Sequence, residues 1–146
     1  MKKQSSRLQP VVDFNQRKET DAAKELAQAS SEVEAQKQRL IEFEAYRSEY
    51  GQQFAQAGSG GLNAARVRDF QAFINKLNHV VEQQKVAIKN AEREYEAKKR
   101  QWLAARNKLK AINKVQEKHI HSEAIAEEKK QQKEQDDRNS RRQNGQ

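Results

Sequence analysis

Few residues of this chain have side chains whose type and spacing suggest metal or acid–base chemistry. His119 and His121 lie two positions apart, and His79 is the third histidine of the sequence. On a helix, side chains two positions apart point away from each other, so this pair of imidazoles cannot hold one metal ion together. The sequence contains no cysteine, which excludes thiolate metal sites and disulfide bonds. We therefore expect exposed histidines and no metal site.

The glycine-rich run Gly58-Ser59-Gly60-Gly61 allows two interpretations. A phosphate-binding loop would follow a strand and end in Gly-Lys-Ser or Gly-Lys-Thr, and this run has neither feature. Glycines also supply the left-handed backbone of a helix end and turn, which is the interpretation we favour. The sequence offers no set of nucleophile, base and orienting group, so we expect no catalysis and no cofactor.

Basic residues outnumber acidic ones, with 29 Lys and Arg against 21 Asp and Glu and a formal net charge of +8 over 146 residues. This balance is typical of nucleic-acid-binding proteins, but base-stacking aromatic residues are missing near the excess charge, except for Trp102. The excess gathers far from the glycines, in Lys2, Lys3, Arg7, Arg17, Lys18, Lys98, Lys99, Arg100, Arg106, Lys108 and Lys110. A basic, nucleic-acid-binding helical hairpin stays open as an alternative function.

Seven-residue columns of apolar side chains predict two long helices that pack along a narrow seam. After the glycines the columns are Ile74, Val81, Ile88, Tyr95, Trp102 and Leu109, and beside them Phe70, Leu77, Gln84, Ala91, Lys98, Ala105 and Ile112. Before the glycines they are Val12, Glu19, Leu26, Val33, Leu40, Arg47 and Phe54, and beside them Asn15, Ala22, Ala29, Gln36, Phe43, Tyr50 and Ala57. Paired columns offset by three and four residues are the pattern of a coiled coil.

The fold class that follows is all-α, with two long helices forming an antiparallel coiled-coil hairpin, because a short connection favours antiparallel neighbours. We expect a flexible basic N-terminus over residues 1–9, a helix over 10–57 that starts at Pro10, and a glycine-rich turn over 58–62. Asn63 is a candidate N-cap for a second helix over 63–135, and residues 136–146 are expected to form a disordered polar tail. We expect an elongated monomer.

A turn near Gly60 would make facing residues those whose numbers sum to about 120. Phe43 then faces Leu77, and Tyr46 lies level with Phe73. Charge supports the pairing, because residues 19–57 carry eight acidic and four basic side chains and residues 84–113 carry nine basic and three acidic ones. Residues beyond about 113 are expected to have no partner helix.

Apolar residues exceed the needs of a two-helix seam near the glycines. Phe73, Val80 and Ala87 form a third column on the second helix, and Tyr46 lies outside both columns of the first. An apolar and aromatic patch on a thin hairpin often marks a binding site, although these side chains could instead only broaden the seam. The residues alone leave both interpretations open.

No apolar stretch approaches the roughly 20 residues of a membrane span. Met1-Lys2-Lys3 is followed by no apolar segment of the kind that a secretory signal requires. We therefore expect a cytoplasmic protein that does not insert into the membrane.

The order of several motifs resembles one known family. Residues 46–50 read Tyr-Arg-Ser-Glu-Tyr, the glycines follow, and then come Phe70-x-x-Phe73-Ile74-x-x-Leu77, Val81-Glu-Gln-Gln84, a single Trp102 and Lys108-Leu109. Over nearly its whole length the chain is similar to the flagellar export protein FliJ of the bacterial type III secretion apparatus.

The resemblance implies a non-enzymatic coiled coil, similar to the central stalk of rotary ATPases, that couples the export ATPase (FliI) ring to the export gate protein FlhA and assists export chaperones. It implies a role in flagellum biogenesis, protein transport and chemotaxis, and a place at the cytoplasmic face of the inner membrane. No nucleic-acid partner is expected. The gate-binding residues that it implies are Phe43, Tyr46, Tyr50, Phe73, Leu77, Val80 and Gln84.

For the ATPase ring we expect contacts from Arg100, Arg106, Lys108 and Lys110, because the gate is assigned to the turn and the excess basic charge lies away from it. Two other functions remain open: a structural scaffold without a motor, and the nucleic-acid-binding hairpin.

Overall fold

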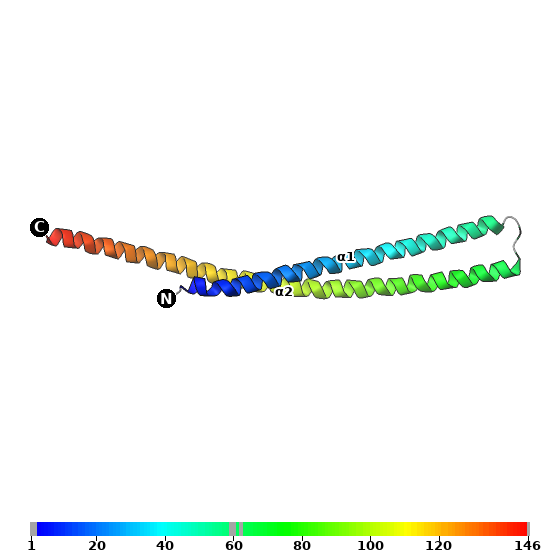
Figure 1. Cartoon of the computed structure of the whole chain (residues 1–146), viewed down its shortest axis with the longest axis horizontal. Helices are drawn as coiled ribbons and strands as arrows, with labels where there is room; N and C mark the ends of the chain where they lie inside the picture. Colours follow the sequence, from blue (N-terminus) through cyan, green and yellow to red (C-terminus); the bar gives the residue numbers. More distant parts are fainter. Residues whose placement is uncertain (1–2, 59–60, 62, 146) are drawn as a thin grey trace. The chain divides into compact units, whose positions relative to one another are not determined.

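The computed structural model describes residues 3–58, 61 and 63–145, and these residues form two long helices (Figure 1). Helix α1 spans Gln4–Gly58 and helix α2 spans Ala64–Asn144, and no strand occurs within the described ranges. The helices pack against each other as a hairpin, which confirms the all-α prediction. Residues 1–2, 59–60, 62 and 146 lie outside the description, so the predicted turn is described only at Gly58 and Gly61.

The chain divides into two units. The turn unit is Ala23–Gln101, and the terminal unit combines Met1–Ala22 with Trp102–Gln146. In the turn unit, the C-terminal half of α1 and the N-terminal part of α2 run side by side in opposite directions (Figure 1). The hairpin therefore buries each apolar stripe against the other, as isolated amphipathic helices of this kind must.

The predicted columns form the buried face of each unit. Val81 is only 1% exposed and is the most deeply buried large side chain of the turn unit, where Ala29, Val33 and Leu77 are also buried. In the terminal unit Leu109 is buried. The other column residues are at least half-buried, apart from Ala57. The seven-residue period thus identified the core.

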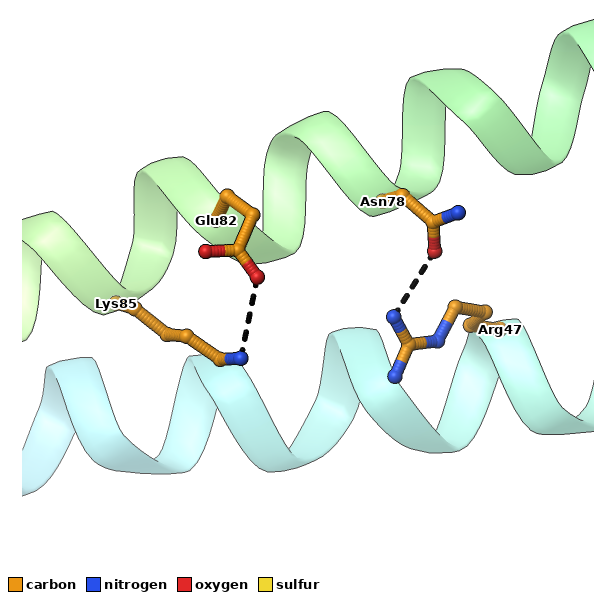
Figure 2. A network of polar contacts seen from close by, with 4 residues as sticks. All are labelled: Arg47, Asn78, Glu82 and Lys85. Carbon is orange, nitrogen blue, oxygen red and sulfur yellow. Dashed lines mark hydrogen bonds and ion pairs between the residues drawn. The ribbon is translucent and has the colours of Figure 1, made fainter.

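Polar side chains inside the seam fix how the helices align. In the turn unit, the Gln84 Nε2 donates to the backbone oxygen of Gln36 at 2.9 Å and to its Oε1 at 2.6 Å. The Arg47 Nη1 reaches across to the Asn78 Oδ1 at 3.0 Å (Figure 2). A sliding of one helix along the other would leave the buried Gln84 amide without its partner, so this contact specifies the register, and the exposed Arg47–Asn78 hydrogen bond is consistent with it. The numbers of Gln36 and Gln84 sum to 120, so this contact agrees with a turn near Gly60.

The ends of the turn follow ordinary capping rules. Gly61 has a φ of 89°, the left-handed conformation that glycine adopts without strain, and its N–H donates to the Gly58 carbonyl at 3.2 Å. The Asn63 Oδ1 accepts the N–H of Arg66 at 2.9 Å. Asn63 is therefore the N-cap of α2, as predicted.

Helix α1 begins at Gln4, earlier than the start predicted at Pro10, so residues 4–9 are helical rather than flexible. Contacts with α2 explain the difference. The Glu123 carboxylate accepts the Ser5 N–H at 3.1 Å and the Ser5 Oγ–H at 2.6 Å, and the Gln116 Nε2 donates to the Ser5 carbonyl at 3.1 Å.

The expectation that α2 has no partner beyond residue 113 was wrong. Gln116 and Glu123 continue the column of Leu109 with polar side chains, which a search for apolar residues overlooks.

Helix α2 continues to Asn144, past the end predicted at residue 135, so the predicted disordered tail is helical over most of its length. Residues 127–144 contain no proline or glycine, and they consist mainly of Glu, Lys, Gln and Arg, which are strong helix formers. The helix ends where Gly145 follows, with the Gly145 N–H donating to the Arg141 carbonyl at 3.1 Å. Within the described ranges, no helix is both long and apolar enough to cross a membrane.

Candidate functional site

Five aromatic rings from both helices meet near the turn and form what we call the aromatic cluster: Tyr46, Tyr50, Phe54, Phe70 and Phe73. The Tyr50 ring centroid lies 4.4 Å from that of Phe73 and 5.5 Å from that of Phe70. Phe54 stacks on Phe70 at 3.8 Å between ring centroids, and the Tyr46 and Phe73 rings meet in a T-shaped arrangement at 6.2 Å. Pairs at such distances are worth about 0.5–1.5 kcal/mol beyond the area they bury.

The heptad positions explain which rings are internal. Phe54, Tyr50 and Phe70 lie in the seam columns and are half-buried. Tyr46 and Phe73 lie beside the seam, each on the edge of its helix that faces the other, so the predicted level pairing of these two residues is confirmed. Tyr46 is 49% exposed even with Phe73 and Tyr50 against it. One edge of the cluster is therefore an aromatic surface open to solvent.

The seven residues predicted to bind the export gate differ in accessibility. Tyr46, Tyr50 and Phe73 are in contact with one another, and Phe43 and Val80 are half-buried. Leu77 and Gln84 are buried at 8% exposure each, and Gln84 is hydrogen-bonded to Gln36. These two side chains serve the hairpin itself and are not available to a partner at the surface. A partner could touch only the other five, which we call the turn patch: Phe43, Tyr46, Tyr50, Phe73 and Val80.

Phe54 and Phe70 belong to the aromatic cluster although the sequence assigned them only to the seam. Their stacking supports Tyr50 and Phe73 from the turn side. The facing rule gave the signal that could have found them, since it brings Phe70 level with Tyr50. They hold the turn patch in place without forming its exposed edge.

The four basic residues predicted to contact the ATPase ring are all exposed. Arg100 belongs to the turn unit, and Arg106, Lys108 and Lys110 belong to the terminal unit. The Arg106 guanidinium lies 5.4 Å from the Trp102 ring centre, a cation–π contact that leaves its charge unneutralised. Among the described residues, none of the four forms an ion pair, whereas Lys98 binds Glu25 at 3.3 Å. Their charge is therefore available to a partner.

The terminal unit carries further basic and apolar surface on α1. Lys18 lies over the Phe14 ring with its Nζ at 4.7 Å from the ring centre, and Phe14 is 49% exposed. Lys3, Arg7 and Arg17 are exposed as well, and Lys2 lies outside the described residues. The Trp102 Nε1–H donates to the Glu19 carboxylate at 2.9 Å, so this tryptophan is fixed and not free to stack on a base.

Glu123 has the one clearly shifted pKa among the described titratable groups. Its hydrogen bonds from the Ser5 hydroxyl and the Ser5 N–H stabilise the charged carboxylate and hold its pKa below the ordinary 4.5. The carboxylate thereby caps the first turn of α1, which has no acidic residue of its own. This interaction closes the terminal unit and does not resemble a catalytic acid in a cleft.

The histidines occupy separate places. His79 and His121 are exposed and His119 is half-buried. In the part of the chain that the structure describes, no three His, Asp or Glu side chains are grouped so that they could hold a metal ion. The structure thus places its unusual side chains in two exposed surfaces, one aromatic and one basic.

A comparison with protein families gives a match over residues 4–146 to the family model described as Flagellar FliJ protein. The match covers nearly the whole chain. No curated protein and no solved structure is similar enough to the chain to count as a match.

Proposed function

This chain belongs to the flagellar FliJ protein family, a structural component of flagellar protein export, and from that premise we propose a specific role. The chain couples the export ATPase (FliI) ring to the export gate protein FlhA. It acts as a stalk-like, non-enzymatic coiled coil, so any catalysis belongs to the ATPase. The observation that carries the proposal is the turn patch, an aromatic surface that the hairpin leaves half-open to solvent.

The turn patch is the contact with the gate protein. Tyr46 is 49% exposed, and the rings of Phe73 and Tyr50 lie against it. Aromatic side chains that are held rigidly at a surface lose little conformational entropy on binding, and they often dominate interface energies. Phe43 and Val80 extend the same contact, and Leu77 and Gln84 contribute by keeping the two helices in register.

The unpaired basic residues provide the contact with the ATPase ring. In the terminal unit, Arg106, Lys108 and Lys110 are exposed and form no ion pair among the described residues. Arg100 of the turn unit is likewise exposed and without an ion pair among the described residues. Such charge would be attracted by an acidic lumen of the ATPase ring, within a screening length of about 8 Å at physiological salt. This attraction speeds the encounter of the two proteins more than it strengthens the final complex.

The same role includes assistance to export chaperones and, through flagellum assembly, a contribution to chemotaxis. The protein works as a monomer, peripheral to the cytoplasmic face of the inner membrane at the flagellar base. The FliJ family supports the flagellar export context for these assignments.

The proposal is tested by measuring ATP hydrolysis of the purified export ATPase while this chain is titrated in. One stalk serves a ring of several subunits, so stimulation should saturate at well below one chain per ATPase subunit. Unchanged hydrolysis at every ratio would contradict the proposal and leave a passive scaffold. A passive scaffold could still bind the ring, which a pull-down measures separately.

A further inference from the structure

The terminal unit has apolar side chains at its surface that the seam does not cover. Val11 on α1 is 42% exposed and Val115 on α2 is 46% exposed. Each valine directly precedes a seam residue of its helix, Val12 and Gln116. The two valines therefore lie beside the seam and not in it.

The antiparallel pairing puts both valines on one flank of the terminal unit. Residues that directly precede the seam face each other across such a hairpin, as the contact between Tyr46 and Phe73 shows in the turn unit. The numbers of Val11 and Val115 sum to 126, within the range of 121 to 128 given by the hydrogen-bonded cross-helix pairs of the terminal unit. Phe14, three residues after Val11 and 49% exposed, extends the same apolar surface.

The acidic side chains of the same segments lie elsewhere. A helix turns by about 100° per residue, so the residues before and after a seam residue point to opposite flanks. Asp13 and Glu117 directly follow the two seam residues that the valines precede. The remaining carboxylates of residues 3–20 and 102–125, Glu19 and Glu123, accept hydrogen bonds within the unit. The apolar flank therefore carries no acidic side chain in these segments.

Basic side chains surround the apolar ones. Arg7 and Lys18 lie four residues before and seven residues after Val11, and Lys118 lies three residues after Val115. All three are exposed, and none forms an ion pair among the described residues. We call this surface the basic–apolar face, and its members are Arg7, Val11, Phe14, Lys18, Val115 and Lys118.

We propose that the basic–apolar face binds directly to an anionic lipid surface. Exposed apolar side chains enter the boundary between headgroups and acyl chains, while long basic side chains reach back to the lipid phosphates. Phe14 and Lys18 already have this arrangement, with the Lys18 Nζ 4.7 Å from the centre of the ring. A nucleic acid would also attract the basic residues, but its bases stack on aromatic rings and gain little from the two valines.

This contact goes beyond the proposed function, because it requires neither the ATPase nor the gate protein. None of the residues assigned to the ring contact or to the turn patch belongs to the basic–apolar face. Lys108 lies one heptad before Val115 and is assigned to the ring, so it stays unchanged in every variant. Vesicles without protein test the lipid contact alone, so its failure would leave the ATPase assay unaffected.

The position of the contact is tested with single fluorescent labels on the full chain, which contains no cysteine. Ala111→Cys places an environment-sensitive fluorophore four residues before Val115. Ala124→Cys places it one heptad after Glu117, on the other flank, and both alanines are exposed. With vesicles of phosphatidylcholine and phosphatidylglycerol, the emission of the Ala111→Cys label should shift to shorter wavelength and that of the Ala124→Cys label should not. Equal responses of the two labels would overturn the proposal.

The contributions of charge and apolar surface are tested by vesicle sedimentation of unlabelled variants. Phe14→Ala should weaken binding about five-fold, whereas Ile120→Ala, which removes a 52% exposed side chain three residues after Glu117, should not. Lys18→Gln with Lys118→Gln should weaken binding at least about ten-fold, and the equal charge change Lys37→Gln with Lys89→Gln in the turn unit should have little effect.

Three results would contradict the lipid contact. Equal binding to vesicles of phosphatidylcholine alone would show that the lipid charge is not read. An unchanged affinity of Phe14→Ala would show that the apolar side chains stay outside the lipid. An equal shift of the Ala111→Cys label with a DNA oligonucleotide, or with an acidic amphipathic peptide, in place of vesicles would assign the face to a nucleic acid or to an acidic protein.

Discussion

Replacing Tyr46 by alanine should separate binding from folding. Tyr46 is half-exposed, so its loss removes about half of the 1.5–3 kcal/mol that full burial of a large apolar side chain contributes, or about 1 kcal/mol of unfolding free energy. If Tyr46 anchors the gate protein, the same change should cost at least about 2 kcal/mol of binding, which is roughly a 30-fold weaker Kd. The loss of affinity should therefore exceed the loss of stability.

Two control variants make the comparison specific. Val81→Ala removes two methyl groups from a side chain that is 1% exposed, so it should cost about 1.5–3 kcal/mol of stability while the folded fraction keeps its affinity for the gate. Phe14→Ala removes an aromatic ring that is 49% exposed, the same fraction as Tyr46, but in the terminal unit. Phe14→Ala should leave gate binding unchanged.

Stability is measured by urea unfolding followed by circular dichroism, and affinity by calorimetric titration with the cytoplasmic domain of the export gate. If Tyr46→Ala lowered the stability of the hairpin as much as Val81→Ala and left the affinity for the gate intact, the separation of binding from folding would be refuted. Tyr46 would then belong to the seam, and the turn patch would have no separate role.

Three further predictions concern pH, backbone and salt. Hydrogen bonds from Ser5 lower the pKa of Glu123, so they stabilise the start of α1 above pH 4.5 and are lost as the pH falls through the folded-state pKa. Amide exchange at Ser5 should show this loss. In the Glu123→Gln variant the Ser5 amide should exchange faster at pH 7 and should not show that loss on acidification. Gly51 lies inside α1, and a methyl group at this position would meet no neighbouring atom within 4 Å. Gly51→Ala should therefore raise the free energy of unfolding, measured by urea titration, by about 0.5–1 kcal/mol. A decrease would contradict this prediction. The association rate of the chain with the ATPase ring should fall as salt rises through about 0.15 M, and a rate independent of salt would exclude electrostatic steering.

The seam could be predicted because its residues obey a strict period. Val81 and Leu109 were assigned to the core by spacing alone, and the facing rule brought Tyr46 level with Phe73. These contacts depend only on heptad position and on the place of the turn, both of which the sequence contains.

The ends of the helices could not be predicted in the same way. The contact between Ser5 and Glu123 joins two polar residues that are 118 positions apart, and neither stands out in a search for apolar periodicity. The end of α2 was predicted too early because the absence of apolar residues was weighted above the strong helix propensity of residues 127–144.

The candidate site was predicted only in part. Motif order pointed to seven residues around the turn, but motif order does not distinguish exposed from buried side chains. The seam columns did separate them, because Leu77 and Gln84 belong to a column and are buried, whereas Tyr46 lies outside both columns and is exposed.

The central claim is that one chain binds the ATPase and the gate through separate surfaces, and a single ATPase assay with three variants tests it most directly. The first variant combines Arg106→Glu, Lys108→Glu and Lys110→Glu, and the second combines Tyr46→Ala with Phe73→Ala. The third combines Lys129→Glu, Lys130→Glu and Lys133→Glu, which changes the net charge equally on an exposed part of α2. Stimulation of ATP hydrolysis should be lost with the first variant and retained with the second and third. Loss with the aromatic pair and retention with the Arg106 variant would contradict the claim, because the turn end would then be the part that meets the ring.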